Sequence, residues 1–332
     1  MKIFYKNLND SGGVPSEIRE FLNLNKNIQP ITRIFSLDFF KSFVKKQDFV
    51  FVGIFNFQLL LGLCLSKIFK NKISIWSIGQ IANYSIDKRL FPKSPIIGEF
   101  SAKKVIDKKI RYKKLFLFFL NKLISKKTIF WCFSTFEEKE ISSIINNASV
   151  FKRVYWPVGS QLKTFIPFKK SIKQRFGFQA KRYFLCYSRI DVKVKGIDRF
   201  LELAFSTYFS PEDYFIVAGP VYNSKFVKET EERLVVLKDK NEFEKINILD
   251  ADWVVLLSRW DGFPRVLREA IKNKIPIIAS KETHFHDLIN RYSIGVCFHG
   301  NLSQLESDIK LFNLENSNFK GAIQEINKCL KI

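Results

Sequence analysis

Cysteine is scarce in this chain of 332 residues, and the few that occur stand far apart. The five cysteines form no CxxC pair; they are Cys64, Cys132, Cys186, Cys297 and Cys329. A disulfide framework or a structural zinc site needs cysteines at short, regular spacings, which are missing here. The sequence therefore predicts unpaired thiols, in keeping with a reducing cytoplasm, and no metal or other bound cofactor.

Long apolar runs are also missing. The longest ones, around residues 59–65 and 115–120, are too short to span a bilayer, which takes about 20 residues of helix. Residues 1–7 turn polar too early for a signal peptide. We therefore expect a protein that is soluble or lies on a membrane surface.

Acidic residues are few, since 32 Asp and Glu stand against 55 Lys and Arg, for a formal net charge of +23. The excess is uneven, because residues 1–160 hold 27 Lys and Arg against 11 Asp and Glu and so carry +16 of this charge. Such a surface attracts anionic membranes, nucleic acid or phosphorylated substrates. A lysine-rich solvated surface without such a partner is the alternative.

Apolar residues, by contrast, make up 46% of the chain, enough for well-packed cores. The length exceeds the usual limit of a single core, so two domains are expected. Short apolar runs alternate with helical segments in both halves, which predicts parallel sheets with helical crossovers. Strands are expected at residues 1–5, 48–53, 73–77, 128–133, 154–157, 183–187, 214–218, 233–237, 253–257 and 276–279.

The boundary between the domains is expected near residues 160–180, where a polar, basic and proline-containing stretch begins. We predict one domain over 1–165, a second over 166–312, and a C-terminal helix over 313–332 that packs back toward the first domain.

A helix is also predicted over 242–249. In the first half, Ser134 and Glu137 have the spacing of a capping box for the helix that follows.

The most informative stretch is the ten-residue run from Asp261 to Ala270. It stands between two apolar runs, so its order is strand, Gly-Pro turn, helix, strand. Asp261 and Glu269 bracket the start of the helix, with seven residues between them. Open α/β sheets bind ligands at the carboxyl ends of their strands, where this turn would place backbone N–H groups and two carboxylates. The run therefore indicates a nucleotide-sugar site.

Several further segments resemble, in order, the retaining glycosyltransferases of family 4, which have the GT-B fold. Residues 188–198 are similar to the family's Arg…Lys-Gly loop, and residues 217–220 resemble its next strand and glycine turn. Residues 251–258 look like its "aD-strand-S" segment, Asp261 to Glu269 match its acidic-x7-Glu motif, and residues 283–285 take the place of a donor-site loop. The resemblance covers residues 180–300 well and the first half only loosely. It implies an α/β protein of GT-B type, with two Rossmann-like domains facing a central cleft.

The resemblance assigns Arg189 and Lys195 to the diphosphate of the donor. When a sugar leaves a nucleotide diphosphate, negative charge builds on the phosphates, and without a metal fixed cations must stabilise it. A basic surface loop, with Lys193 alongside, is the alternative.

The resemblance also implies that Asp261 contacts the donor sugar and that Glu269 holds the ribose hydroxyls. Pro264 suits the first turn of a helix whose free N–H groups bind anions, and Gly262 lets the backbone approach the donor. Alternatively, Asp261 caps the helix and Glu269 pairs with Arg265 at i, i+4. The remaining donor-site candidates are Phe263, Val266, Leu267, Gly219, Thr283, Gly12 and Gly13.

The chain departs from the family at two places. The first acidic position of the motif is usually Glu and is Asp261 here. Relatives carry a histidine near the position of residues 77–80, whereas the only histidines here are His284, His286 and His299. His284 is either a substitute contact for the sugar or an ordinary surface histidine.

Residues 101–127 contain many lysines and only one acid, around the apolar run 115–120. This pattern fits a helix on an anionic membrane surface. A buried helix with solvated basic ends fits equally well.

We therefore predict an enzyme, a retaining glycosyltransferase that uses a nucleotide sugar and a glycan or lipid-linked acceptor in surface polysaccharide or lipopolysaccharide synthesis. It would work in the cytoplasm, at the inner face of the plasma membrane. The resemblance also implies that it needs no dedicated base, because a donor phosphate oxygen would take the acceptor's proton. The main alternative is a catalytically weak or silent GT-B-like binding or assembly subunit. Nucleic-acid binding ranks last, because none of the usual motifs occurs.

Overall fold

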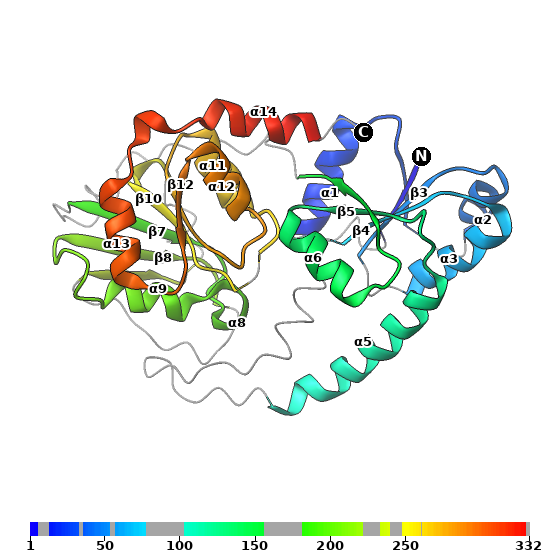
Figure 1. The fold of residues 1–332 in the computed structure, drawn as a ribbon, viewed down its shortest axis with the longest axis horizontal. Coiled ribbons are helices and arrows are strands. Elements are labelled where there is room, and N and C mark those ends of the chain that lie inside the picture. Colours follow the sequence, from blue (N-terminus) through cyan, green and yellow to red (C-terminus); the bar gives the residue numbers. More distant parts are fainter. Residues whose placement is uncertain are drawn as a thin grey trace. The chain divides into compact units, whose positions relative to one another are not determined.

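The chain folds into two compact units, each built on its own parallel sheet (Figure 1). The computed structural model describes residues 1–5, 13–32, 36–53, 57–77, 103–155, 181–221, 233–239, 248–259 and 261–329. The first unit contains the first sheet and the second unit contains the second sheet. The predicted domain boundary at 165/166 lies outside the described residues.

The sheet of the first unit has the strand order β2-β1-β3-β4-β5-β6, with every neighbouring pair parallel. Its strands are β1 (Lys2–Phe4), β2 (Gln29–Ile31), β3 (Phe49–Val52), β4 (Ile73–Trp76), β5 (Ile129–Cys132) and β6 (Val150–Arg153). Its helices are α1 (Gly13–Leu24), α2 (Leu37–Val44), α3 (Phe57–Phe69), α5 (Lys103–Leu123) and α6 (Thr135–Ile144).

The central strands β3 and β4 are buried at every residue. A parallel sheet covered on both faces has this uniformly apolar pattern, which explains why they read as short continuous apolar runs. Phenylalanine fills much of the space between sheet and helices; for example, the rings of Phe43 and Phe49 stack with centroids 4.1 Å apart.

The sheet of the second unit has the order β12-β11-β10-β7-β8-β9, again all parallel. Its strands are β7 (Arg182–Tyr187), β8 (Asp213–Ala218), β9 (Leu234–Leu237), β10 (Trp253–Leu256), β11 (Ile277–Ser280) and β12 (Gly295–Phe298). Its helices are α8 (Val192–Lys195), α9 (Ile197–Ala204), α11 (Arg265–Lys272), α12 (His286–Tyr292) and α13 (Leu302–Leu311). The last helix, α14 (Phe319–Cys329), belongs to the second unit up to Glu325, and its remaining residues are assigned to the first unit. Because β7 lies beside β10, the loops that follow these two strands meet at one edge of the sheet.

Some sequence expectations need correction. The strand expected at 154–157 is β6, which ends at Arg153. The strands β2 and β12 and the helices α2, α8 and α12 were not expected. Of the helix expected at 242–249, residues 242–247 lie outside the described residues, and Ile248–Asp250 forms a short 3-10 turn. These segments are short, so they carry little periodic signal.

The capping box before α6 is confirmed in part. Ser134 caps the helix, and its hydroxyl oxygen accepts a hydrogen bond from the Glu137 N–H at 3.1 Å. The Glu137 carboxylate accepts from the N–H of Phe133, one residue before the cap, at 2.7 Å. Its other oxygen accepts from the hydroxyl of Ser77, at the end of β4, so this buried carboxylate joins two strand ends.

Candidate functional site

Lys195 is held at the end of β7 by the short helix α8. Asp191 caps α8, because its carboxylate accepts from the Val194 N–H at 3.2 Å. Gly196 then turns the chain into α9 with a φ of +63°. A Cβ at this position would lie 2.2 Å from the carbonyl oxygen of Leu257, so the loop after β10 passes directly against the glycine. Only glycine combines this backbone angle with so close an approach.

Two of the predicted site residues meet. The Lys195 ammonium donates a hydrogen bond to Oδ2 of Asp261, and the side chains are 16% and 10% exposed. The hydroxyl of Ser258 donates to the same oxygen at 3.3 Å. These residues come from loops after β7 and β10, 66 residues apart. Lys195, the predicted phosphate-binding cation, and Asp261, the predicted sugar-binding carboxylate, therefore form one cluster. Ser258 also belongs to this cluster and was not predicted from the sequence.

Arg189 lies in the same loop as Lys195 but is more exposed. Its guanidinium forms an ion pair with Asp191 at 3.5 Å, and its side chain is 43% exposed. The carboxylate that caps α8 thus also orients this arginine.

The helix of the acidic motif begins one residue later than its proline. Pro264 is the N-cap of α11, with extended backbone angles, and Arg265 is the first helical residue. The expectation that Pro264 stands at or near the first helical position is met within one residue. Gly262, Phe263, Val266 and Leu267 are all buried, so these four predicted donor-site residues lie in the packed interior around the start of the helix.

Glu269 is nearly fully buried, with 5% of its surface exposed. Its Oε1 accepts a hydrogen bond from Nε of Arg265 at 3.2 Å, the i, i+4 pairing considered as the alternative to a ribose contact. The two partners differ in exposure, since the side chain of Arg265 is 48% exposed and that of Glu269 only 6%. A pair formed for surface stability alone would leave both ends in solvent. The burial of Glu269 therefore sets it apart from an ordinary surface ion pair.

The loop after β11 is buried rather than exposed. The Thr283 hydroxyl donates to the carbonyl of Ser280 at 2.8 Å, and Thr283 and His284 are fully buried. The interpretation of His284 as a surface histidine is wrong. Its backbone N–H donates to the carbonyl of Asp261 at 2.9 Å, so the two loops are joined directly.

Two ion pairs connect helix α9 to the loops after β10 and β11. Neither pair was predicted from the sequence. Asp198 pairs with Arg259, whose Nη1 also donates to the carbonyl of Val192 at 2.6 Å. The next residue, Arg199, makes a two-pronged pair with Glu282 at 3.0 and 3.2 Å. The sequence shows two adjacent charged residues, Asp198 and Arg199, at the start of an amphipathic helix. It cannot predict their ion-pair partners, because these lie more than 60 residues away along the chain.

The remaining predicted site glycines are Gly219, Gly12 and Gly13. Gly219 follows β8 with a φ of +152°, and a Cβ there would lie 2.0 Å from the carbonyl oxygen of Ser188, so this position requires glycine. Gly13 is the first residue of α1 in the first unit, and Gly12 lies outside the described residues.

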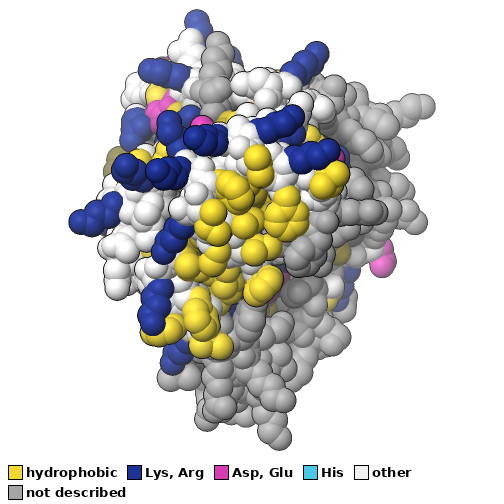
Figure 2. Space-filling view, turned by 90° about the vertical axis from the view of Figure 1, so that its right-hand side faces the viewer, with side chains coloured by type: hydrophobic (Ala, Val, Ile, Leu, Met, Phe, Trp, Pro, Cys, Tyr) yellow, Lys and Arg dark blue, Asp and Glu magenta, His cyan; other side chains and the backbone are white. Residues whose placement is uncertain are grey.

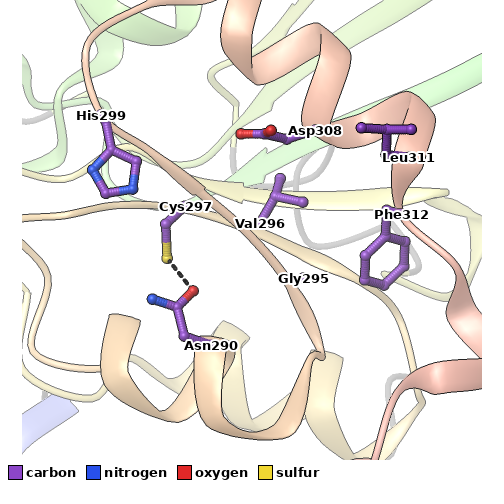
Figure 3. A pocket seen from close by; sticks show the side chains of 8 residues that line it. All are labelled: Asn290, Gly295, Val296, Cys297, His299, Asp308, Leu311 and Phe312. Atoms are coloured by element: carbon purple, nitrogen blue, oxygen red, sulfur yellow. Dashed lines mark hydrogen bonds between the residues drawn. The ribbon is translucent and has the colours of Figure 1, made fainter.

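The thiols of the second unit are unsuited to nucleophilic roles. Burial raises the pKa of Cys186, in β7, to about 11. Burial, followed by the charge of Asp287, raises the pKa of Cys297 to about 12. Cys297 lines a pocket of about 330 Å³ beside the edge strand β12, together with His299 and Asp308, and its thiol donates to Asn290 at 3.2 Å (Figure 3). None of the predicted site residues lines this pocket.

The described residues contain no group of three or more His, Cys, Asp and Glu side chains arranged to hold a metal ion. In the same residues, no helix has both the length and the apolar character needed to cross a membrane.

Comparison with known proteins gives a family likeness for most of the second unit. Residues 168–323 match the model of the family described as Glycosyl transferases group 1. This segment is therefore similar to a group 1 glycosyltransferase domain. It contains every predicted donor-site residue except Gly12 and Gly13, and the predicted enzyme class is confirmed. No curated protein matches the chain by sequence.

Solved structures extend the likeness over both units. HepE from Anabaena, in complex with UDP, aligns with a TM-score of 0.63 at 14% identity, over 99% of this chain and 96% of that one. The sucrose-phosphate synthase of Thermosynechococcus elongatus gives 0.59 at 12% identity, over 99% and 94%. The UDP-forming trehalose-phosphate synthase of Burkholderia vietnamiensis gives 0.55 at 12% identity, over 98% and 75%. Together with the two six-stranded parallel sheets, these alignments confirm the predicted GT-B fold.

Proposed function

We propose that this group 1 glycosyltransferase moves a sugar from a nucleotide-sugar donor to a glycan or lipid-linked glycan, with retention of the anomeric configuration. The cluster of Lys195, Asp261 and Ser258 carries this proposal, since it lies where the loops after β7 and β10 meet. Structures of HepE with UDP-glucose and of the E. coli trehalose-6-phosphate protein with UDP-2-fluoro glucose support a uridine nucleotide as the first donor to test.

In the proposed reaction, the bond between the anomeric carbon and the phosphate oxygen breaks, and the leaving diphosphate takes the electron pair. Lys195 and the more exposed Arg189 stabilise the charge that develops on the phosphates. The acceptor hydroxyl attacks from the same face as the leaving group, and its proton passes to a donor phosphate oxygen. Glu269 holds the ribose hydroxyls from its buried position in α11. Because side-chain cations supply the compensating charge, a chelator should leave turnover unchanged.

The pairing of Lys195 with Asp261 gives the Asp at this position a defined task. Before the donor binds, the carboxylate holds the ammonium in place and limits its mobility. When the diphosphate takes over the ammonium, the carboxylate becomes available to the hydroxyls of the sugar. Asp261 would thus act first as a positioning residue for Lys195 and then as a sugar contact.

A catalytically silent nucleotide-binding subunit is the second candidate. Two observations favour it: Asp261 replaces the longer Glu of the family, and its carboxylate already has Lys195 as a partner. Such a subunit would bind the nucleotide and form no product.

Product formation with a panel of nucleotide sugars, together with calorimetric binding of UDP, separates the candidates. For an enzyme, we expect Lys195→Ala to lower kcat/KM by about 10² to 10³ fold, as for the loss of one donor to a developing anion. Lys272→Ala, at an exposed lysine at the end of α11, is the control for loss of a surface charge and should leave the rate unchanged. Nucleotide binding without product from any donor would establish the silent subunit, and full turnover by Lys195→Ala would refute the diphosphate assignment.

For its cellular place, we propose the cytoplasmic face of the plasma membrane and a role in surface polysaccharide or lipopolysaccharide synthesis. The strongly basic first half of the chain supports this proposal.

A further inference from the structure

Three neighbouring helices of the first unit each expose an apolar stripe to solvent. Helix α3 packs between α2 and α5, and the space-filling view shows hydrophobic side chains gathered into one patch flanked by lysines and arginines (Figure 2). Soluble proteins rarely leave large contiguous apolar patches exposed unless the patch binds something.

On α5 the apolar run 115–120 divides between core and surface. Phe116, Leu117 and Leu120 are buried. Leu115, Phe118 and Phe119 are 58%, 53% and 46% exposed. The expected burial of this segment therefore holds for one face of the helix only, and the expected contact with an anionic membrane stays a prediction. The exposed residues have the spacing i, i+3, i+4, which places them on one side of the helix.

The two other helices repeat this pattern. On α3, Phe57 and Ile68 are 64% and 70% exposed, and Cys64 is exposed between them. On α2, Leu37 and Val44 are 67% and 63% exposed. With Phe40 of α2, these residues form what we call the apolar face: Leu37, Phe40, Val44, Phe57, Cys64, Ile68, Leu115, Phe118 and Phe119.

Lysines accompany every stripe of the apolar face. The exposed lysines on and next to these helices are Lys41, Lys45, Lys46, Lys67, Lys70, Lys72, Lys114, Lys122, Lys126 and Lys127. The Lys122 ammonium lies 4.3 Å from the centre of the Phe118 ring, and Lys67 of α3 donates to the carbonyl of Lys122 at 3.3 Å. Helix α3 itself contains no acidic residue. The face therefore combines exposed aromatic and aliphatic side chains with positive charge.

We propose that the apolar face docks on an anionic lipid bilayer, with α2, α3 and α5 lying against the surface. An interfacial helix buries its apolar side at the headgroup boundary while its lysines meet anionic headgroups, and this chain offers both features on three adjacent helices. A second copy of the chain is a poorer occupant, because a two-fold contact would bring the same lysines together. A nucleic acid would use the lysines but leave the exposed leucines and phenylalanines in water.

Cys64 provides a direct probe of this docking, since it is exposed on the apolar face while Cys132, Cys186 and Cys297 are buried. The full chain carrying Cys329→Ser is labelled at Cys64 with a polarity-sensitive dye and mixed with vesicles. We expect a blue shift of the emission with vesicles of phosphatidylcholine and phosphatidylglycerol, and none with phosphatidylcholine alone. The absence of a shift with the anionic vesicles would overturn the proposal.

Flotation of unlabelled protein with the same vesicles tests the named residues. We expect strongly reduced binding by the triple variant Leu115→Ser, Phe118→Ser, Phe119→Ser. The matched control replaces exposed apolar residues of the second unit and should bind as wild type: Phe205→Ser, Tyr208→Ser, Leu311→Ser.

The lysines are tested in the same way. The test variant neutralises three of them with the substitutions Lys67→Gln, Lys122→Gln and Lys126→Gln. Each lysine lost should weaken vesicle binding by about fivefold. The control set lies in the second unit and should have no effect: Lys272→Gln, Lys310→Gln, Lys320→Gln. Equal losses in test and control sets would contradict the assignment. A wild-type dimer that dissociates in the apolar variant, with vesicle binding unchanged, would make the face a contact between copies instead.

Discussion

At the scale of single residues, the site depends on buried charges whose partners lie far along the chain. Lys195 with Asp261, and Asp198 with Arg259, each join the segment after β7 to the loop after β10. Breaking a buried pair by removing one partner costs more than losing a surface pair, because the other charge stays behind without compensation. Substitutions at these positions should therefore affect folding as well as binding, so the rate of Lys195→Ala is compared with that of wild type only after circular dichroism shows that the variant is folded. The simpler test of function uses a residue whose partner is exposed.

Glu269 is such a residue, because its partner Arg265 is half-exposed. If Glu269 holds the ribose, Glu269→Gln should weaken UDP binding about tenfold or more, as expected for hydrogen bonds to a charged group. Arg265→Ala removes the same ion pair but leaves the carboxylate, and should change the affinity by less than about threefold. Calorimetric titration of both variants with UDP makes the comparison. Equal losses in the two variants would reduce Glu269 to a partner of Arg265.

At the scale of elements, short segments between strands and helices position the site residues more than the long helices do. The four-residue helix α8 is capped at its start by Asp191 and ended by Gly196. This brief turn fixes the direction in which Lys195 points. A helix so short has little stability of its own, so its cap, its terminal glycine and the neighbouring loop hold it together.

Gly196→Ala tests this arrangement. The left-handed backbone costs an alanine about 1–2 kcal/mol. The contact with the Leu257 carbonyl, at 2.2 Å from the new Cβ, adds to that cost. Gly300→Ala is the matched control, because its φ is +94° and a Cβ there meets nothing within 4 Å. Urea unfolding followed by circular dichroism should show a clearly larger loss for Gly196→Ala. Similar losses would mean that the loop after β10 moves aside without cost.

At the scale of the whole molecule, each unit has its own core. The apolar cluster of the first unit contains residues such as Phe43 and Phe130, and that of the second contains Phe184 and Trp253, with no residue in common. Units with separate cores can unfold in separate steps, so a single two-state transition is not expected for this chain.

Nucleotide binding should reveal this division. If the donor site belongs to the second unit, UDP at a hundred times its Kd should stabilise that unit by about 2.7 kcal/mol. Hydrogen exchange measured by mass spectrometry should then slow in β10 and β11, with a much smaller change in β3 and β4. Equal protection of both sheets would show that the nucleotide stabilises the two units as one.

The class of fold and the order of the site motifs could both be predicted from the amino-acid sequence. Apolar runs such as 49–52 and 253–256 are local signals, and the run from Asp261 to Ala270 is contiguous, so both could be recognised without a structure. The strand order, the pairing of Lys195 with Asp261 and the burial of His284 could not, because they depend on which strands lie side by side. The division of the run 115–120 between core and surface likewise depends on packing and could not be predicted from its sequence. Helical spacing shows which residues share a face, but the packing of α5 against α3 settles which face meets solvent.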